Sequence, residues 1–392
     1  MKGQKISSIE GLRGLACFMV IMSHLSLMFL PYLHGENPKQ IIGWLDRMLY
    51  NSPFGFIYSG TSAVYIFFVL SGYILSYACV SKGDLIRNCV NMATRRYARL
   101  AIPVFTSIII CFLVLSYSED RTYAMPWISN YGKNVDVSFW GAINNGIFSS
   151  IFMGDNRYNW VTWTMKIEFY GSLLVFAAIP IINNLKCKAL ISFVVGSFFV
   201  LCSPGKDGYG YASFFFGIAL YFARDFRSSL SAIIVFIMGA YLAGYHYRQP
   251  SYAMLTSFMT FDLPGGKILH YYFVNMISGV LIVYATVKSN VFSFLVANRF
   301  SVWLGKLSFS AYLLQMPVYY FLTTRLYLAC QAYEMNYAKS ATLSAIITIV
   351  AIYFLSHIFW LIVDVGSIKL SKLFLRVVDE TVHSTTKIEI IK

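Results

Sequence analysis

The stretch EGLRGLACFMVIMSHLS, residues 10–26, decides how the rest of the chain is interpreted. It is apolar enough to form a membrane span, yet it contains Arg13 and His24. A central arginine costs about 2.5 kcal/mol or more on membrane-insertion scales, and ionisable residues inside spans usually line a site or a pathway. The stretch therefore predicts a transmembrane helix that carries function.

The composition of the whole chain indicates a membrane protein. Of its 392 residues, 58% are hydrophobic and 12% are charged, and the charged fraction is about half that of an ordinary soluble domain. We predict an all-α polytopic membrane protein, with a transmembrane domain over 1–365 and a basic cytoplasmic tail over 366–392. Windows of about 20 apolar residues predict ten transmembrane helices, at 11–33, 57–80, 100–117, 161–182, 189–203, 209–223, 231–246, 270–287, 307–327 and 341–363.

The distribution of basic residues predicts the orientation. The net charge is +14 at pH 7, which by itself would also suit a nucleic-acid-binding protein. With both termini in the cytoplasm, roughly twice as many Lys and Arg lie on the cytoplasmic side as outside, in line with the positive-inside rule. We therefore predict an N-in, C-in protein whose partner is the lipid bilayer and not nucleic acid. The seven cysteines show no metal-binding spacing, so no metal site is predicted.

Arg13 and His24 are expected to lie on one face of the first helix. They are eleven positions apart, which at ~100° per residue returns to within about 20° of the same direction and spans roughly 16 Å of helix. Cys17 and Val20 lie between them on that face. The alternative interpretation is that Arg13 is a basic flank and that His24 is a hydrogen-bonding group in helix packing.

The stretch RRYARLAIP, residues 95–103, brings arginines to the cytoplasmic entry of the third predicted span. Arg96 and Arg99 are three positions apart, so their guanidinium groups can converge on one patch. Planar guanidinium groups suit the oxygens of phosphate, although basic flanks are also common at the cytoplasmic ends of spans. Pro103 is expected in the first helical turn, where a missing amide proton costs little.

The stretch FFVLSGYIL, residues 67–75, lies in the inner half of the second predicted span. Ser71 and Gly72 allow close approach of another backbone or of a thin ligand, and Tyr73 offers a hydroxyl group. Packing against another helix is the alternative, because small residues are common where membrane helices touch.

The stretch WVTWTMKIEFYGSLLVF, residues 160–176, carries Glu168 about eight residues after the start of an outside-to-inside span. Its depth is then comparable with that of His24. A buried carboxylate needs a cationic or hydrogen-bonding partner, and His24 is the expected one, since such pairs orient general bases. A structural salt link between helices is the alternative.

The predicted depths of these groups suggest a reaction. Cytoplasmic arginines would hold a phosphorylated donor, and a thin arm about 16 Å long would fit between Arg13 and His24. Coenzyme A thioesters have that shape, so the pattern predicts acyl transfer across the bilayer. The polar outer stretch 118–160 is expected to cap a cavity or to bind an acceptor.

Several motifs together resemble the acyltransferase-3 family of bacterial membrane-bound acyltransferases, which O-acetylate O-antigens, capsules and exopolysaccharides. They occur in the family's order from the first predicted span to the ninth. The matching residues are Arg13 with His24, Ser71 with Gly72 and Tyr73, Arg96 with Arg99, Trp163 with Thr164, Met165 and Glu168, and the segment LGKLSFSAYLLQMPVYYF at 304–321.

The resemblance implies about ten spans in the bacterial inner membrane and a catalytic histidine, carried over to His24. It implies acyl-CoA, usually acetyl-CoA, as a co-substrate bound from the cytoplasm, with no permanently bound cofactor, and a surface saccharide or glycolipid as acceptor. The donor site would comprise Arg13, Arg96, Arg99, Ser71, Gly72 and Tyr73, with Glu168 beside His24 and with Trp163, Tyr312 and Gln315 as possible supporting residues.

Two positions depart from the family pattern. Tyr73 stands where phenylalanine is usual, and Gln315 stands where histidine is usual. Glutamine only forms hydrogen bonds, so proton transfer at Gln315 is not expected. The alternative function is a proton-coupled transporter or flippase of a polar or saccharide substrate, with Arg13, His24 and Glu168 along its pathway. The oligomeric state is left open.

Overall fold

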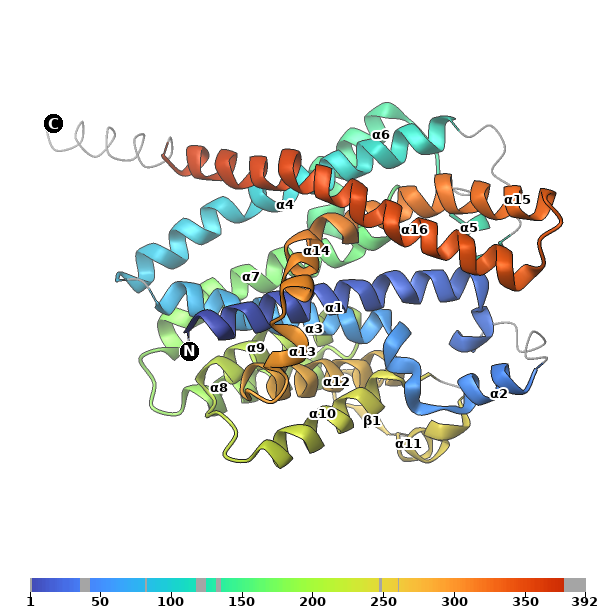
Figure 1. Ribbon diagram of the computed structural model, residues 1–392. Coiled ribbons are helices and arrows are strands. Elements are labelled where there is room, and N and C mark those ends of the chain that lie inside the picture. The colour runs from blue at the N-terminus through green and yellow to red at the C-terminus, as the bar shows by residue number, and fades with distance from the viewer. Residues whose placement is uncertain are drawn as a thin grey trace, which may run out of the picture.

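The computed structural model describes residues 2–35, 43–81, 83–117, 125–131, 135–246, 249–259 and 261–376. They form a bundle of long helices, with α1 (Lys2–Phe29) running through its middle (Figure 1). The start of α1 and the last described turns of the C-terminal helix lie at the same end of the bundle (Figure 1).

The remaining elements are long helices joined by short helices, single turns and a small hairpin. The long helices are α3 (Gly60–Val80), α4 (Leu85–Tyr117), α7 (Trp163–Ile182), α8 (Lys188–Cys202), α9 (Lys206–Phe222), α10 (Ser229–Ala243), α12 (His270–Val287), α14 (Arg299–Val318) and α16 (Tyr337–Phe359). The short helices are α2 (Trp44–Asn51), α5 (Pro126–Ser129), α6 (Phe139–Asn144), α11 (Ala253–Phe258), α13 (Ser293–Val296) and α15 (Thr324–Ala332). The 3₁₀ and π segments are η1 (Pro31–His34), η3 (Pro53–Tyr58), η4 (Asn145–Met153), η5 (Trp160–Thr162), η6 (Pro250–Tyr252), η7 (Tyr319–Thr323) and η8 (Trp360–Asp364). The hairpin pairs β1 (Asp262–Leu263) with β2 (Gly266–Lys267).

The prediction of an all-α polytopic membrane protein is confirmed. Within the described residues, six helical segments have the length and hydropathy of membrane spans, namely Ile6–Phe29, Gly60–Val80, Leu85–Tyr117, Trp160–Ile182, His270–Val287 and Tyr337–Arg376. α8 and α10 are shorter apolar helices, and α9 and α14 lie over two further predicted spans. The count of ten spans and the N-in orientation remain predictions.

Some predicted boundaries differ from those of the structure. α4 begins at Leu85 instead of near residue 100, so Pro103 lies inside the helix and not in its first turn. α14 begins at Arg299, eight residues before the predicted start. Charged residues lower the local hydropathy there, although the helix itself continues. At the C-terminal end, helix runs unbroken through residue 365 to Arg376, and the predicted tail beyond it, 377–392, lies outside the described residues.

Close packing of α1 against α14 sets the position of His24. A Cβ added to Gly305 would lie 1.9 Å from the Glu10 carbonyl oxygen, so only glycine allows this approach, as is common where membrane helices touch. Seven residues make about two helical turns. The Cys17 Sγ donates to the Ser308 carbonyl at 3.2 Å, and two turns further along both helices His24 therefore meets Gln315.

Candidate functional site

One cavity, which we call the inner cavity, lies toward the N-terminal end of α1 and has a volume of about 480 Å³. It is lined by the predicted donor-site residues Arg13, Arg96, Arg99 and Ser71, and also by Glu168. Its apolar walls include Phe67, Phe68, Leu70, Ile74, Leu75, Leu100, Met165, Phe309 and Trp360. Glu10, Lys306 and Asp364 also line it, so the cavity combines four basic and three acidic side chains with an extended apolar wall.

Glu168 is held by Arg96 inside this cavity. The Arg96 guanidinium forms an ion pair with the Glu168 carboxylate and donates from Nε to Ser172 Oγ at 2.8 Å. Ser71 Oγ donates to the same carboxylate at 2.9 Å. Both charged side chains are largely buried, with 11% of Arg96 and 17% of Glu168 exposed. Arg96 is therefore committed to Glu168. Arg13 also lines the cavity, where its guanidinium lies 3.5 Å from the Glu10 carboxylate, and both side chains are 30% exposed. Arg99 is more exposed than Arg96.

The structure does not bear out the predicted pairing of Glu168 with His24. Glu168 lines the inner cavity, and His24 lines an outer one. α4 starts earlier than expected, so Arg96 lies eleven residues into that helix, roughly 16 Å from its start. There its guanidinium forms the ion pair with Glu168 of α7.

The outer cavity has a volume of about 390 Å³ and surrounds His24. Its other polar and aromatic lining residues are Ser23, His34, Thr61, Trp160, Trp163, His246, Tyr271 and Tyr312. Trp163, predicted as a supporting residue, therefore lies beside His24 and not with the donor-site arginines. Within the described residues, no group of three or more His, Cys, Asp or Glu side chains is arranged to hold a metal ion.

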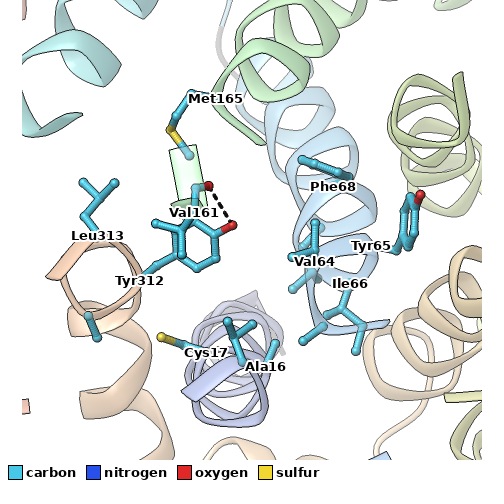
Figure 2. Close-up of a cluster of buried hydrophobic side chains, with 14 of the residues drawn as sticks. Ala16, Cys17, Val64, Tyr65, Ile66, Phe68, Val161, Met165, Tyr312 and Leu313 are labelled. Atoms are coloured by element: carbon cyan, nitrogen blue, oxygen red, sulfur yellow. Dashed lines mark hydrogen bonds between the residues drawn. The ribbon is translucent and has the colours of Figure 1, made fainter. Parts of the chain in front are cut away.

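Val64 and Tyr312 line both cavities and so form the wall between them. Figure 2 shows the Tyr312 and Val64 side chains facing each other from different helices, with Ala16 and Cys17 of α1 below them in the view. The Tyr312 hydroxyl lies 3.1 Å from Thr164 Oγ1 and donates to the Val161 carbonyl at 3.1 Å (Figure 2). These bonds fix the ring at the point where the cavities approach each other.

Gln315 determines which nitrogen of the neutral His24 ring carries the hydrogen. The Gln315 Nε2 donates to the Tyr312 carbonyl at 2.9 Å, which determines the direction of the amide. Its Oε1, which only accepts, lies 2.9 Å from His24 Nδ1. Nδ1 therefore carries the hydrogen of the neutral ring, and Nε2 is left with a lone pair. An imidazole nitrogen in this state can accept a proton from a substrate hydroxyl.

The outer stretch 118–160 contributes a cap to His24, as predicted for its described part. Trp127 stacks on the His24 ring with a centroid distance of 5.2 Å and an interplanar angle of 22°. Trp160 packs edge-on against Trp127 at 5.3 Å. Trp127 was missed as an individual site residue, since a tryptophan in a polar outer stretch has no spacing that connects it with His24.

Gly72 and Tyr73 lie outside the inner cavity, unlike their neighbour Ser71. A Cβ on Gly72 would lie 2.1 Å from the Phe214 carbonyl oxygen, so Gly72 is where α3 and α9 touch. The Tyr73 ring packs edge-on against Tyr221 of α9 at 5.7 Å. The structure thus supports the packing alternative for both residues and leaves Ser71 at the site.

His34 and His246 are further histidines of the outer cavity, and the sequence motifs did not include them. Their rings are 5.1 Å apart and nearly perpendicular. Burial lowers the pKa of His34 well below its usual range, and the neighbouring His246 lowers it further. Burial also lowers the pKa of His246, against the opposing effect of its bond to the Gly244 carbonyl. Both imidazoles are therefore neutral at pH 7.

Comparison with known proteins supplies the family. The sequence model of a family described as an acyltransferase domain, Acyl_transf_3, matches residues 6–365. The chain belongs to this acyltransferase family. An O-acetyltransferase of Phomopsis amygdali, PaAT-1, is similar at 24% identity over 221 residues, which cover 48% of this chain and 42% of that protein. The match thus spans less than half the length of that relative. No solved structure matches the chain.

The family match covers the helices that build both cavities. It begins in α1 before Arg13 and ends beyond the Asp364 that lines the inner cavity. This member of the acyltransferase family therefore holds its arginines, His24 and the Tyr312 wall within one family domain. Its Gln315, where the family pattern has histidine, occupies the place of a ring-orienting group beside His24.

Proposed function

We propose that the protein transfers an acetyl group from cytoplasmic acetyl-CoA to a hydroxyl group of a surface or lipid-linked saccharide. The chain would lie in the bacterial inner membrane with both termini in the cytoplasm. The observation that carries this proposal is the wall of Val64 and Tyr312, with the arginine-lined cavity on one side and the His24 cavity on the other. Membership of the acyltransferase family and the similarity to an O-acetyltransferase support it.

The inner cavity suits the donor. Arg13 and Arg99 line it as cations and would contact the phosphate groups of coenzyme A. The apolar wall that includes Phe67, Phe68 and Leu70 would contact the thin pantetheine arm. Arg96 and Glu168 hold each other, so they would shape this cavity and position its surface instead of binding phosphate directly.

The outer cavity suits the acceptor. An acceptor hydroxyl would donate to the lone pair of His24 Nε2, which takes its proton as the oxygen attacks the thioester carbonyl carbon. The carbon–sulfur bond then breaks, and the thiolate of coenzyme A leaves with the proton that the His24 imidazolium returns. Net, an ester and free coenzyme A form from an alcohol and a thioester. Direct attack by His24 Nε2, giving an acetyl-His24 intermediate, is a second route at the same nitrogen.

The test is acetyl-CoA consumption by the purified full chain, before and after His24→Ala. General-base catalysis is typically worth about 10²–10⁴-fold, so the variant should lose at least two orders of magnitude in transfer while it still inserts and folds. His357→Ala is the matched control, because His357 is an exposed residue of α16 outside both cavities. Acetyl-CoA consumption that survives in His24→Ala contradicts the mechanism. Saccharide movement across vesicles without acetyl-CoA consumption would instead support a transporter.

The acceptor is tested separately in cells. Surface polysaccharide from strains with and without the gene is compared by NMR for O-acetyl groups. The proposal expects O-acetyl signals that disappear with the gene and with His24→Ala. Identical spectra in all strains would contradict a surface saccharide as acceptor.

A further inference from the structure

The outer cavity contains more imidazole groups than one proton transfer needs. His24 is the base in the proposed function, yet His34 and His246 line the same cavity. Each of these rings has one nitrogen fixed by a neighbour, so the chemistry of the other nitrogen follows from the geometry. The inference below rests on the proposed function and specifies its acceptor.

His246 presents a buried lone pair. It lies three residues beyond the end of α10, and only 3% of it is exposed. Its Nδ1 is 2.9 Å from the Gly244 carbonyl, which only accepts, so Nδ1 carries the hydrogen. Nε2 is then an acceptor, and this buried atom has no hydrogen-bond partner among the described residues. An unsatisfied buried polar atom destabilises the folded protein, so a ligand that donates to Nε2 would remove this destabilisation.

His34 is fixed in the complementary way. Its Nε2 lies 2.7 Å from Ser26 Oγ, and Ser26 Oγ already donates its hydrogen to the Ser23 carbonyl at 2.9 Å. The Ser26 oxygen can therefore only accept, so His34 Nε2 is the donor and Nδ1 holds a lone pair. Because burial keeps both imidazoles neutral, they are acceptors at physiological pH and not cations.

Such a cavity favours ligands that can donate hydrogen bonds to the imidazole nitrogens. Carboxylates and phosphates only accept hydrogen bonds, so they could not satisfy these lone pairs. Hydroxyl groups both donate and accept, and a polyhydroxylated molecule can donate to several nitrogens at once. The indole rings of Trp160 and Trp163 and the phenol of Tyr271 supply apolar wall for its carbon skeleton.

We propose that the outer cavity is a subsite for a neutral polyol, in which a second hydroxyl of the acceptor donates to His246 Nε2 while the reacting hydroxyl donates to His24. His246 is thus a specificity-determining residue that favours acceptors with more than one hydroxyl group. A simple alcohol can engage His24 or His246, but not both.

The experiment uses glycerol as the polyol probe and 1-propanol as the single-hydroxyl comparison. The full chain, with its six histidines labelled with ¹⁵N, is titrated with glycerol, and the His246 Nε2 resonance is assigned by its loss in His246→Gln. Glycerol should move this resonance. In parallel, the ratio of glycerol to 1-propanol acetylation is measured for the wild type, His246→Phe and His246→Gln.

The expected changes are specific. His246→Phe keeps a ring but loses the acceptor, so the ratio should fall about 2- to 10-fold, the value of one hydrogen bond. His246→Gln can still accept through Oε1 and should keep most of the ratio. His270→Phe is the matched control, because His270 is the first residue of α12 and lines neither cavity.

The outcomes separate this inference from the proposed function. An unmoved His246 resonance, or a ratio in His246→Phe within twofold of the wild type, overturns the subsite. A moved resonance in a wild-type protein that consumes no acetyl-CoA supports the polyol subsite and overturns the acetyl-transfer proposal. Acetyl transfer that is indifferent to His246 supports the transfer proposal and overturns the subsite.

Discussion

Replacing Gln315 with leucine should slow the chemical step without weakening donor binding. In the folded chain, Gln315 Oε1 lies 2.9 Å from His24 Nδ1, and the amide is directed by its own bond to the Tyr312 carbonyl. Leucine has a similar size but accepts no hydrogen bond. The His24 Nδ1 hydrogen then has lost its partner, and the ring is free to turn or to carry its hydrogen on Nε2 instead.

The size of the effect follows from that single bond. Leaving a buried donor unsatisfied costs about 1–3 kcal/mol, and each 1.36 kcal/mol is a factor of ten in rate. We therefore expect kcat for acetyl transfer to fall about 5- to 150-fold in Gln315→Leu. The loss should remain below that of His24→Ala, which removes the base itself and its ~10²–10⁴-fold contribution.

The assay is steady-state acetyl transfer at varied acetyl-CoA, with the KM for acetyl-CoA expected to stay unchanged. Gln315 contacts His24 and does not line the donor cavity. Gln315→His, which restores an acceptor and the usual residue of the family pattern, should regain activity. Tyr319→Phe is the control, since its hydroxyl makes only a 3.4 Å contact with Oε1 and otherwise donates to the Ile21 carbonyl. A Gln315→Leu enzyme within twofold of wild type, or one whose defect lies in KM, refutes the reasoning.

Further predictions concern the inner cavity, the wall and pH. Glu168→Gln leaves the buried Arg96 without its counter-charge and should lower the unfolding free energy by about 3 kcal/mol, as measured by chemical unfolding in detergent. The double variant Arg96→Gln/Glu168→Gln should recover part of this loss. Equal losses in the single and double variants would contradict the prediction. Tyr312→Ala joins the cavities and should raise acetyl-CoA hydrolysis in the absence of acceptor, whereas Tyr312→Phe, which keeps the ring and loses bonds worth about 1 kcal/mol, should not. Burial lowers the pKa values of His34 and His246 in the folded chain, whereas histidines of the unfolded chain have a pKa of about 6.5. Below that pH the unfolded chain therefore binds more protons than the folded chain. The free energy of unfolding should be constant above pH ~6.5 and fall as the pH drops through it. Thermal unfolding between pH 8 and 5 measures this, with a smaller fall in His34→Gln; a midpoint that does not change with pH would exclude the mechanism.

Helical periodicity predicted three of the α1 residues that line the cavities, whereas Glu10, Ser23 and Leu27 of the same helix were not predicted. Arg13 lines the inner cavity, and Val20 and His24 line the outer one, as residues of one face should. Cys17, on the same face, is fully buried against α14. Within one regular helix, the spacing of residues in the sequence determines the directions of their side chains. The prediction therefore did not depend on the rest of the fold.

Depth across different helices could not be predicted in this way. A span was predicted from residue 100, whereas the helix α4 begins 15 residues earlier, about 22 Å of helix. Arg96 was predicted at the cytoplasmic entry of that span, and its ion pair with Glu168 was not predicted. Charged residues inside a long helix lower hydropathy in the same way as a helix end does, so a hydropathy window cannot distinguish the two.

Contacts between distant parts of the chain also could not be predicted from the sequence. Gly72 suited either a ligand or a helix neighbour, and only the position of Phe214 in α9 decides for the neighbour. His246 lies 222 positions after His24 and in no motif, yet both line one cavity. Gln315 was identified from the family pattern, but its role required the direction of its amide group.

The wall between the cavities explains how donor and acceptor could react without either crossing the bilayer. Arg13 and His24 are separated by roughly 16 Å of α1, and Val64 and Tyr312 stand between their cavities. In the proposed reaction only the acyl group and the end of the donor arm pass this wall, so the charged head of coenzyme A stays with the arginines and the polyol stays with the histidines. An apolar wall at this point also keeps water from the thioester until an acceptor fills the outer cavity. For that reason the acceptor-free hydrolysis rate, measured with and without the Tyr312 ring, is the most direct measure of whether the wall separates the reactants.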